Sequence, residues 1–476
     1  MPFKPKTKDE LIEAIKEYCE NDDRSNGNIN DWDVSLITDM SELFYCCYYS
    51  NCNKKIHHFS QSLNNWDVSN VANMRYMFYG CKEFNQPINN WDISNVTDMN
   101  GMFIECTNFN QPINDWDVSK VINMSHMFYE CNEFSQQLNN WNVSNVTNMN
   151  SMFSCCYVFN QPINNWNVSN VTNMSDMFYF CNEFNQPMNN WNVSNVTNMN
   201  SMFYICKEFN QPINNWDVSN VNDMSSMFYN CKEFNQSINN WNVSNVTKMN
   251  GMFFACKKFN KSINNWDVSN VTDISYMFYE CHKFNQPINN WNVSKVTSMN
   301  CIFCYCYDFD QPIDKWNVSK VNDMNSMFYN CNAFNQPLNN WNVSNVTNMN
   351  SMFRNCYAFN QPINNWDVSN VTNMSSMFCN CRVFNQPVNN WNVSKVTNMS
   401  HMFYECKKIN KTYREQFYMA NIEKKNKYVL DKLSKDMSII KIYYMSKEKE
   451  FIMNNINDNQ KNEIQNFIKN KTEDIC

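Results

Sequence analysis

Glycine is almost missing from this chain: among 476 residues only four occur, Gly27, Gly80, Gly101 and Gly251. Phosphate-binding loops of the G-x-G-x-x-G and Walker A types need closely spaced glycines, because the backbone must approach the phosphates. No two of these glycines stand close enough to build such a loop. The sequence therefore excludes nucleotide-dependent enzymes of those two types.

Long apolar runs and blocks of like charge are also missing. No run of about 18 apolar residues is present to span a bilayer, and the first twenty residues lack the apolar segment of a secretion signal. The net charge of −7 is distributed without a block of like charges, which argues against nucleic-acid or membrane-surface partners. We therefore expect a soluble protein without a membrane span, and a cytoplasmic one on the absence of a signal.

What the chain does contain is a repeat. Tryptophan occurs at Trp66, Trp91 and every 25 residues onward to Trp391, and Trp32 opens the series ahead of an insertion at 48–58. A single repeat of this length cannot bury its own apolar face, so stacked coils share one core and form a solenoid. We predict a helical cap at 1–27 with a helix at Lys8–Glu20, a solenoid of about 15 coils at 28–410, and a helical cap or tail at 411–476.

Each coil is numbered here from its tryptophan, which is position 0. Positions +5, +8, +11, +12 and +15 are apolar, for example Val371, Met374, Met377, Phe378 and Cys381. Spacings of three and four residues are typical of one face of a helix, and the serine at +3 would serve as its N-cap. The rest of the coil, Phe-Asn-Gln-Pro-Ile-Asn-Asn-Trp, predicts a short strand. The predicted fold is an α/β tandem-repeat solenoid with one short strand and one short helix per coil.

Positions +10, +13, +14 and +17 vary most between copies. They too are three or four residues apart, so they predict the solvent face of the helix. The candidate binding residues on or beside this face are Tyr276, His282, Arg354 and His401. The strand side is instead a uniform carpet of asparagine and glutamine. Which of the two sides binds a partner is left open by the sequence.

Fifteen of the 23 cysteines fill one position of the repeat. We predict a column of buried, reduced cysteines, because free cysteine is among the most buried residue types. Disulfides between coils are the alternative in an oxidising compartment. Cys301, Cys304 and Cys306 form a C-x-x-C-x-C cluster without a second cysteine pair, which is a weak zinc signal. His57 and His58, near Cys52 in the insertion, are a weaker metal candidate. We therefore predict no metal and no cofactor.

Aspartate and asparagine alternate freely at +1 and +7, as at Asp67 and Asp98. Catalysis or calcium binding would require the carboxylate, so this interchange favours a structural hydrogen-bonding role. No set of residues predicts catalysis, and we expect the protein not to be an enzyme.

The pattern W-[DN]-V-S-N-V-T-[DN]-M-S-x-M-F-x-x-C-x-x-F-N-Q-P-[IL]-N, repeated over about 28–410, resembles the BspA-like leucine-rich-repeat surface-protein family. This resemblance implies a leucine-rich-repeat-like superhelix, roles in adhesion or protein–protein contact, and a surface or extracellular location. We predict a non-catalytic, Asn-rich protein-interaction scaffold with protein partners. The alternative is a cell-surface adhesin or glycan-binding protein, in which the Asn-Val-Ser and Asn-Val-Thr sequons would carry glycans.

Overall fold

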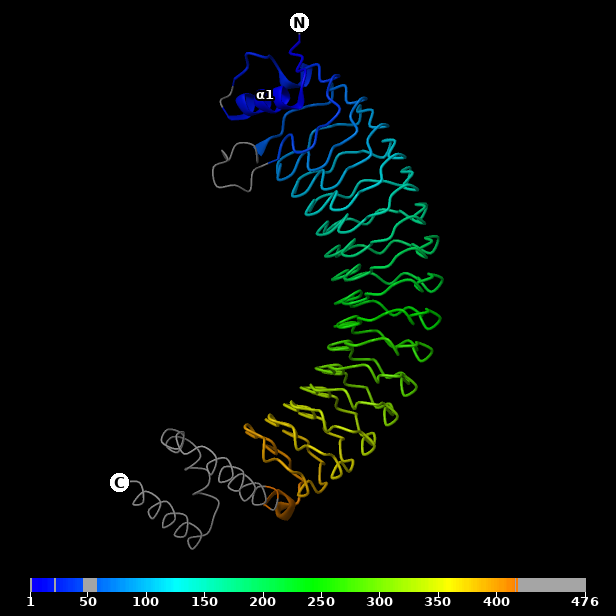
Figure 1. Cartoon of the computed structure of the whole chain (residues 1–476), viewed down its shortest axis with the longest axis vertical. Coiled ribbons are helices and arrows are strands. Elements are labelled where there is room, and N and C mark those ends of the chain that lie inside the picture. Colours follow the sequence, from blue (N-terminus) through cyan, green and yellow to red (C-terminus); the bar gives the residue numbers. More distant parts are fainter. Residues whose placement is uncertain (1, 21–22, 46–57, 416, 418–476) are drawn as a thin grey trace, which may run out of the picture.

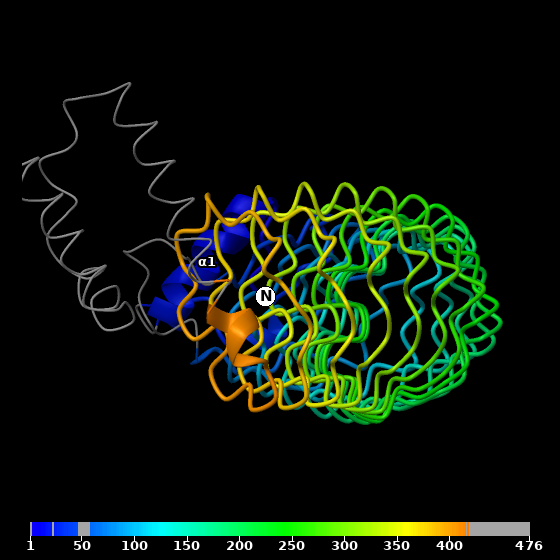
Figure 2. The same ribbon diagram turned by 90° about the horizontal axis from the view of Figure 1, so that it is seen from below.

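A computed structural model describes residues 2–20, 23–45, 58–415 and 417. The repeats stack coil upon coil and the stack bends into an arc (Figure 1). Seen along the arc, successive coils overlie one another (Figure 2). The predicted tandem-repeat solenoid is therefore confirmed. Residues 48–57 of the predicted insertion and 418–476 of the predicted C-terminal cap lie outside the described residues.

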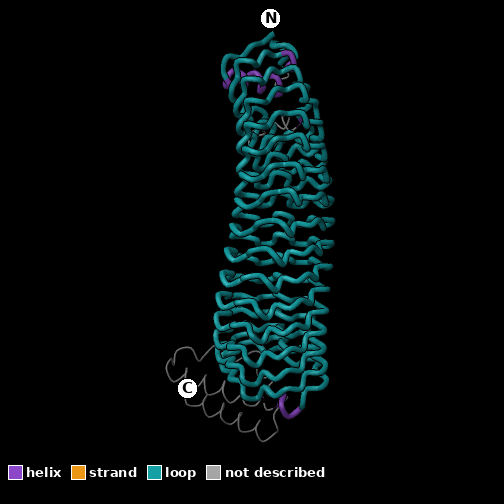
Figure 3. Tube along the Cα trace, turned by 90° about the vertical axis from the view of Figure 1, so that its right-hand side faces the viewer, coloured by secondary structure: helices purple, strands orange, loops and turns teal. Residues whose placement is uncertain are grey.

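The prediction of one short helix and one short strand per coil is wrong. Over the described coils from 59 to 410 the backbone has neither, and Figure 3 draws these coils as loop. The first coil is preceded by a short 3-10 helix, η1, at Ile29–Asp31. Between +8 and +15 each coil is a ribbon of consecutive β-turns. In the coil of Trp191 these turns are closed by N–H groups of Met202, Tyr204 and Cys206, which donate to carbonyls three residues earlier at 3.0–3.2 Å.

The alternate N–H groups of the same ribbon bond to the next coil. Met199, Ser201, Phe203 and Ile205 donate to carbonyls of the following coil at 2.7–3.1 Å. A helix satisfies its amides internally, whereas this turn ribbon leaves every second amide available for the neighbouring coil. The ribbon thereby couples each coil to the next through the backbone.

Two corners of the ribbon have left-handed backbone conformation. Position +10 and position +14 have positive φ in coil after coil, for example 51° at Ser201 and 60° at Ile205. These corners are four residues apart, so the residues at +8, +11, +12 and +15 point inward with nearly the spacing of a helix. The apolar pattern that predicted a helix is shared by this turn ribbon, which explains the error.

One short parallel ladder follows the ribbon. Position +7 of each coil forms an isolated parallel bridge with +7 of the next, starting at Asp39 with Asn73 and ending at Asn373 with Asn398. Backbone bonds of this type set neighbouring chains about 4.8 Å apart. The ribbon from +6 to +14, called the inner ribbon below, is therefore the closely spaced side of the solenoid.

The N-terminal helix is present at the predicted residues. Helix α1 spans Lys8–Glu20, and the Thr7 hydroxyl accepts a hydrogen bond from the N–H of Glu10 at 3.2 Å, which is N-capping geometry. Leu11, Ile15 and Tyr18 are buried, and the Tyr18 ring meets Trp32 of the first coil edge-on at 5.8 Å. Thus α1 covers the first coil (Figure 1). At the other end, residues 411–415 and 417 are helical, and Phe417 packs on Phe403.

The core is made of columns of identical side chains. Valines at +2 and +5, methionines at +8 and +11, phenylalanines at +12 and +18, the cysteine at +15 and the tryptophan are buried in nearly every described coil. Across two coils, the rings of Phe178 and Phe203 stack at 5.7 Å. Each column continues from coil to coil, so the described coils share one core.

The spacing of these columns shows how the solenoid bends. Between the same two coils, ring centroids are 4.5 Å apart for Tyr179 and Tyr204 at +13, 5.7 Å for Phe178 and Phe203 at +12, and 6.4 Å for Trp166 and Trp191. A stack is most compressed on the inside of its bend. The inner ribbon therefore lines the concave side of the arc and the tryptophans lie toward the convex side.

On the convex side, from +19 around to +4, asparagine side chains bridge the coils. Asn185 Oδ1 accepts from the N–H of Asn210 at 3.0 Å, Asn164 Oδ1 from the N–H of Asn190 at 3.0 Å, and Asn220 Nδ2 donates to the Ser194 carbonyl at 2.7 Å. Each bridge inserts an amide group where the inner ribbon has a direct backbone bond. This outer edge is consequently wider, and the difference bends the stack.

The interchangeable acids have the predicted structural role. Oδ1 of Asp67 at +1 accepts from the N–H of Ser69 at 3.1 Å, and Oδ1 of Asn198 at +7 accepts from the N–H of Asn200 at 2.9 Å. Asparagine and aspartate both offer this oxygen, so either residue can close the turn. The prediction of a hydrogen-bonding role is confirmed.

Candidate binding face

An aromatic strip runs along the middle of the inner ribbon. The strip is centred on the column of side chains at +13. There the rings of successive coils stack with centroids 4.1–4.5 Å apart: Tyr179, Tyr204, Tyr229, Phe254 and Tyr279. Such stacking adds to the stability gained from burial of ring surface alone. The strip therefore presents a preformed row of ring edges and phenol hydroxyls to the concave side.

The strip widens where the next coil departs from the pattern. That coil has Cys304 at +13, and its neighbour Tyr305 contacts Tyr279 at 5.6 Å and Tyr329 at 5.1 Å, both edge-on. Tyr305 also meets Tyr307 at 6.3 Å. The row of rings thus continues past the cysteine. The aromatic strip is defined as Tyr179, Phe180, Tyr204, Tyr229, Phe254, Tyr276, Tyr279, Tyr305, Tyr307 and Tyr329.

Three of the four candidate residues predicted from the sequence meet on this strip. Tyr276 at +10 lies beside Tyr279, with centroids 6.1 Å apart, and is 38% exposed. His282 stacks on Tyr307 at 4.6 Å. The Arg354 guanidinium lies over the Tyr329 ring, 5.6 Å from its centroid. Although they come from different coils, these side chains are joined through one network of rings.

The fourth candidate lies apart. His401 occupies the +10 corner of the last coil, where its ring meets Tyr404 edge-on at 5.8 Å. Tyr404 is 58% exposed, the highest value among the large exposed apolar residues of the described chain. The C-terminal end therefore carries a separate aromatic corner.

Burial keeps the strip's phenols protonated. Desolvation, the largest cause, raises the pKa of Tyr229 and of Tyr279 to about 12. For Tyr305, the hydrogen bond with Tyr329 is the main cause of its raised pKa. Burial lowers the pKa of His282, and nearby Lys257 adds to that effect. Near neutral pH the strip is therefore an uncharged set of hydroxyl donors and acceptors.

Charge changes along the concave side. Acidic residues predominate beside the strip's N-terminal end: Glu105, Glu130, Glu133, Asp176 and Glu183. Beyond its C-terminal end the inner ribbon holds Arg354 and Glu405, and the basic residues Arg382, Lys407 and Lys408 follow it at +16 and +17. The Arg382 guanidinium lies 4.2 Å above the ring of Tyr357. A partner lying along the whole concave side would meet acidic, aromatic and basic zones in turn.

The strip itself was not predicted. Position +13 was grouped with the variable positions, yet a tyrosine or phenylalanine fills it in ten coils: Tyr45, Tyr79, Tyr129, Tyr179, Tyr204, Tyr229, Phe254, Tyr279, Tyr329 and Tyr404. A count by residue class at each position, in place of a count of how often the residue changes, would have revealed this column.

The cysteine column is reduced and buried, as expected, over the described coils. Its thiols donate to the carbonyl of the +12 phenylalanine in the preceding coil, as Cys206 does to Phe178 at 3.0 Å. Burial raises the pKa of these thiols well above the ordinary value. Cys52 and His57 lie outside the described residues, and His58 bonds to Glu83. Within the described part, no three His, Cys, Asp or Glu side chains are placed to share a metal ion.

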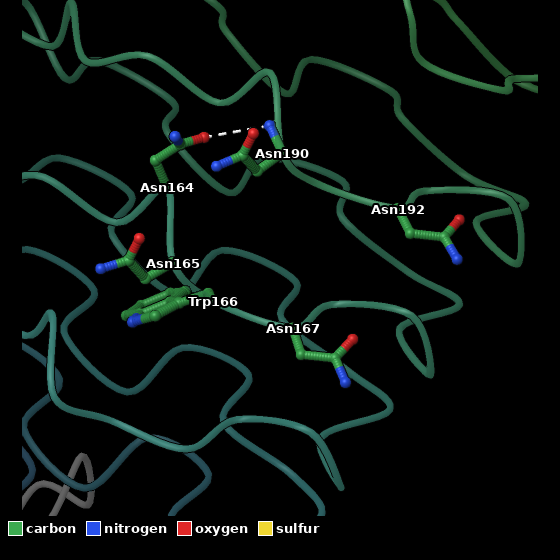
Figure 4. A pocket seen from close by; sticks show the side chains of 6 residues that line it. All are labelled: Asn164, Asn165, Trp166, Asn167, Asn190 and Asn192. Carbon is green, nitrogen blue, oxygen red and sulfur yellow. Dashed lines mark hydrogen bonds between the residues drawn. The ribbon is translucent and has the colours of Figure 1, made fainter.

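A shallow groove lies on the outer edge. It is lined by Trp166 and by asparagines of two adjacent coils (Figure 4), namely Asn164, Asn165, Asn167, Asn190 and Asn192. Trp166 is only 2% exposed, so the groove offers amide groups but no open ring face. The equivalent positions of the other coils hold mostly asparagine, with aspartate or lysine in places such as Asp115 and Lys315.

A protein-family model described as "Mycoplasma protein of unknown function, DUF285" matches the chain repeatedly, over residues 13–138, 105–215, 131–239, 205–315 and 301–417. No curated protein is significantly similar in sequence. No helix of the described residues is long and apolar enough to cross a membrane.

Two solved structures are similar in part. A leucine-rich cell surface protein from Faecalibacterium prausnitzii is 17% identical, with 57% of this chain and 86% of that protein covered and a TM-score of 0.30. A leucine-rich-repeat protein from Eubacterium ventriosum is 13% identical, with 72% and 82% covered and a TM-score of 0.34. At such low TM-scores these likenesses carry no weight for function.

Proposed function

The chain belongs to the DUF285 family, and from that premise we propose that it is a non-catalytic protein-interaction scaffold that binds an elongated protein partner along its concave side. The observation that supports this function most directly is the aromatic strip. Its rings are already ordered by stacking, so the side chains of the strip would lose little conformational entropy when a partner binds. Aromatic residues are also the type most enriched at the energetic centres of protein interfaces.

The chemistry of the strip defines the kind of partner. Ring edges and neutral phenols suit a partner segment with apolar side chains and exposed backbone groups. The acidic zone before the strip and the basic zone after it favour a partner with the opposite order of charge. Within this proposal Tyr276, His282 and Arg354 belong to one binding surface, and His401 to its C-terminal edge.

We also propose that the chain is a BspA-like member of the leucine-rich-repeat proteins, with about fifteen coils and helical caps at 1–27 and 411–476. The long motif repeated from Trp32 to Trp391 supports this assignment. The packing of α1 on Trp32 and the helical residues 411–415 support capping at both ends. Caps of this kind shield the ends of a solenoid from association.

The test is capture from an extract of the native cell, with full-length chain as bait and a strip variant beside it. The variant carries Tyr229→Ser, Tyr276→Ser and Tyr307→Asn. Other coils hold serine at +13 and +10, and asparagine at +16, as at Ser154, Ser326 and Asn332. The three changes therefore use residues that the fold already accepts.

A matched control carries Asn192→Asp, Asn242→Asp and Asn292→Asp on the outer edge, where other coils hold aspartate, as at Asp217. We expect protein partners to be captured by the native chain and by this control, and lost with the strip variant. Equal capture by all three proteins would refute binding by the strip.

Glycan binding by a surface adhesin is the second candidate function. It is supported by the asparagine-lined groove on the outer edge (Figure 4), since amide groups can hydrogen-bond to sugar hydroxyls. This function predicts the reverse result: oligosaccharide binding that the outer-edge control loses and the strip variant keeps. Isothermal titration with the oligosaccharides selected on a glycan array would measure it.

A further inference from the structure

One coil differs from all others in its ribbon, because it has cysteine at both +10 and +13. Side chains at these two positions lie next to each other in other coils. The rings of Tyr76 and Tyr79 are 6.0 Å apart, and those of His126 and Tyr129 are 6.1 Å apart. In the exceptional coil the same two positions are filled by Cys301 and Cys304.

The backbone between these cysteines is a closed turn. The N–H of Cys304 donates to the carbonyl of Cys301 at 3.2 Å, which brings the first and fourth Cα atoms of a β-turn within about 7 Å. A disulfide requires Cα atoms about 4.4–6.8 Å apart. Adjacent side-chain positions on such a turn therefore permit a disulfide with little movement of the backbone.

We propose that Cys301 and Cys304 form a redox-active dithiol that peroxide oxidises to a disulfide within one turn of the concave ribbon. Both thiols are reduced in this structure. This site goes beyond the scaffold function and is independent of which partner the strip binds.

The surroundings make Cys301 the attacking sulfur. Interaction with the Cys304 thiol, and to a smaller extent with the hydroxyls of Ser326 and Tyr276, lowers the pKa of Cys301 against the effect of burial. The bond to Cys301 and burial together raise the pKa of Cys304. Of the two thiols, Cys301 is therefore the more readily deprotonated and the better nucleophile.

Access distinguishes this pair from the cysteine column. Cys301 is 8% exposed, whereas the core thiol of the same coil, Cys306, is fully buried. Within the pair Cys304 is only 2% exposed, so Cys301 is the residue that a small oxidant such as peroxide meets first.

The reaction balances with peroxide as the only co-reactant. The Cys301 thiolate attacks one peroxide oxygen, the O–O bond breaks, and the leaving hydroxide takes a proton to become water. The resulting sulfenic acid on Cys301 is then attacked by Cys304, which loses its proton as the second water leaves. Two thiols are oxidised and one peroxide is reduced to two waters.

Closure would alter the aromatic strip locally. Tyr276 of the preceding coil holds the same +10 position as Cys301 and is among the most exposed rings of the strip. Cys304 also stands in the +13 column between Tyr279 and Tyr329. Formation of the disulfide would therefore change the aromatic strip on the concave side when the protein is oxidised.

The test treats the reduced full-length chain with hydrogen peroxide, then denatures it in an alkylating reagent and maps every cysteine by mass spectrometry. We expect the peptide holding Cys301 and Cys304 to lose two hydrogens and escape alkylation. The half-buried Cys155 and the buried Cys379 should still be alkylated at that stage.

Two serine variants separate the roles of the two sulfurs. Serine already occupies +10 as Ser326 and +13 as Ser154, so both variants retain residues the fold accepts. Cys304→Ser should trap the sulfenic acid on Cys301, detected as a dimedone adduct, whereas Cys301→Ser should leave Cys304 unoxidised. Oxidation of Cys155 or Cys379 before this pair, or no adduct in Cys304→Ser, would overturn the proposal.

Discussion

The two long edges of the solenoid connect the same coils by different means. On the inner ribbon, backbone amides such as those of Ser201 and Phe203 bond directly to the next coil at 2.9 Å. On the outer edge, an asparagine amide stands between the two backbones, as at Asn185 and Asn164. The comparison shows that curvature here arises from the length of the connection and needs no helix on the convex side.

The two edges also tolerate different residues. A hydrogen bond between backbone groups does not depend on the side chain. The exposed positions of the inner ribbon can therefore vary without loss of the bonds between coils. A side-chain bridge depends on the particular amide, so the outer edge repeats asparagine almost without change. The outer edge is uniform and the inner ribbon is variable because the outer edge joins its coils through side chains and the inner ribbon through the backbone.

Proline should separate the two edges most strongly. Ser201→Pro removes the amide that donates to Ser225 at 2.9 Å and cannot adopt the φ of +51° observed there. We expect a loss of at least about 3 kcal/mol, measured as the free energy of unfolding in urea. Hydrogen exchange should show the opening centred on this coil.

The matched control is Ser237→Pro on the outer edge. Its position, +21, is already proline in ten coils, including Pro212 and Pro287. Stability should change little, because the fold accepts proline there. Equal destabilisation by the two substitutions would mean that the inner bonds do not dominate the coupling between coils.

Removing one outer bridge should have an intermediate effect. Oδ1 of Asn185 accepts from the Asn210 N–H and from Gln211 Nε2, both at 3.0 Å. Asn185→Ala leaves both donors without this acceptor, so we expect a loss of about 1–3 kcal/mol in calorimetric or urea unfolding.

Aspartate should rescue that bridge. The chain itself holds Asp310 at the equivalent position, where it accepts from the Asn335 N–H at 2.9 Å. Asn185→Asp is therefore expected to be nearly as stable as the native protein. If Asn185→Asp were as destabilising as Asn185→Ala, an accepted hydrogen bond would not be the role of this residue.

The same contrast explains which features the sequence could predict. The period, the buried columns, α1 and the interchange of Asp and Asn follow from residue types alone, because each has one simple physical cause. The turn ribbon does not, since corners at +10 and +14 repeat every four residues and place Met199, Met202 and Phe203 inward as a short helix would. The hydrogen bonds between coils and the left-handed corners distinguish the two structures. The bonds leave no mark on the side-chain pattern, and the corners are marked by glycine only at Gly80, Gly101 and Gly251.

The binding face was only partly predictable for a related reason. Tyr276, His282 and Arg354 were singled out as unusual residues, but their connection depends on the stacked column at +13. One coil contributes a single ring to that column. The rings form a continuous surface only because stacking brings those of successive coils close together, for example to 4.5 Å between Tyr179 and Tyr204. Spacing between coils is a property of the stack, which no single repeat encodes.

Relief of backbone strain at the inner corners should change the free energy of unfolding by less than the substitutions above, and should increase it. Ile205 is β-branched and has a φ of +60°, a conformation that disfavours such residues by about 1–2 kcal/mol. Gly80 occupies the same position with a φ of +76°. Ile205→Gly should therefore stabilise the protein by roughly 1 kcal/mol in urea unfolding, although it deletes an apolar side chain. Gly251→Ala, at a φ of +62°, should instead destabilise it.

The smallest expected effect is a pH dependence at another inner corner. His126 is half-buried, its Nδ1 has no hydrogen-bond partner among the described residues, and burial lowers its pKa from 6.5. Because the folded pKa is below the unfolded one, the unfolded chain binds the proton more readily. Stability is then complete above pH 6.5 and falls as the pH drops through that value toward the folded pKa. Thermal melts between pH 7.5 and 5 should show this loss in the native chain and a weaker one in His126→Ser, whose serine matches Ser151 of the next coil. The same slope in both proteins would assign the pH dependence to other groups.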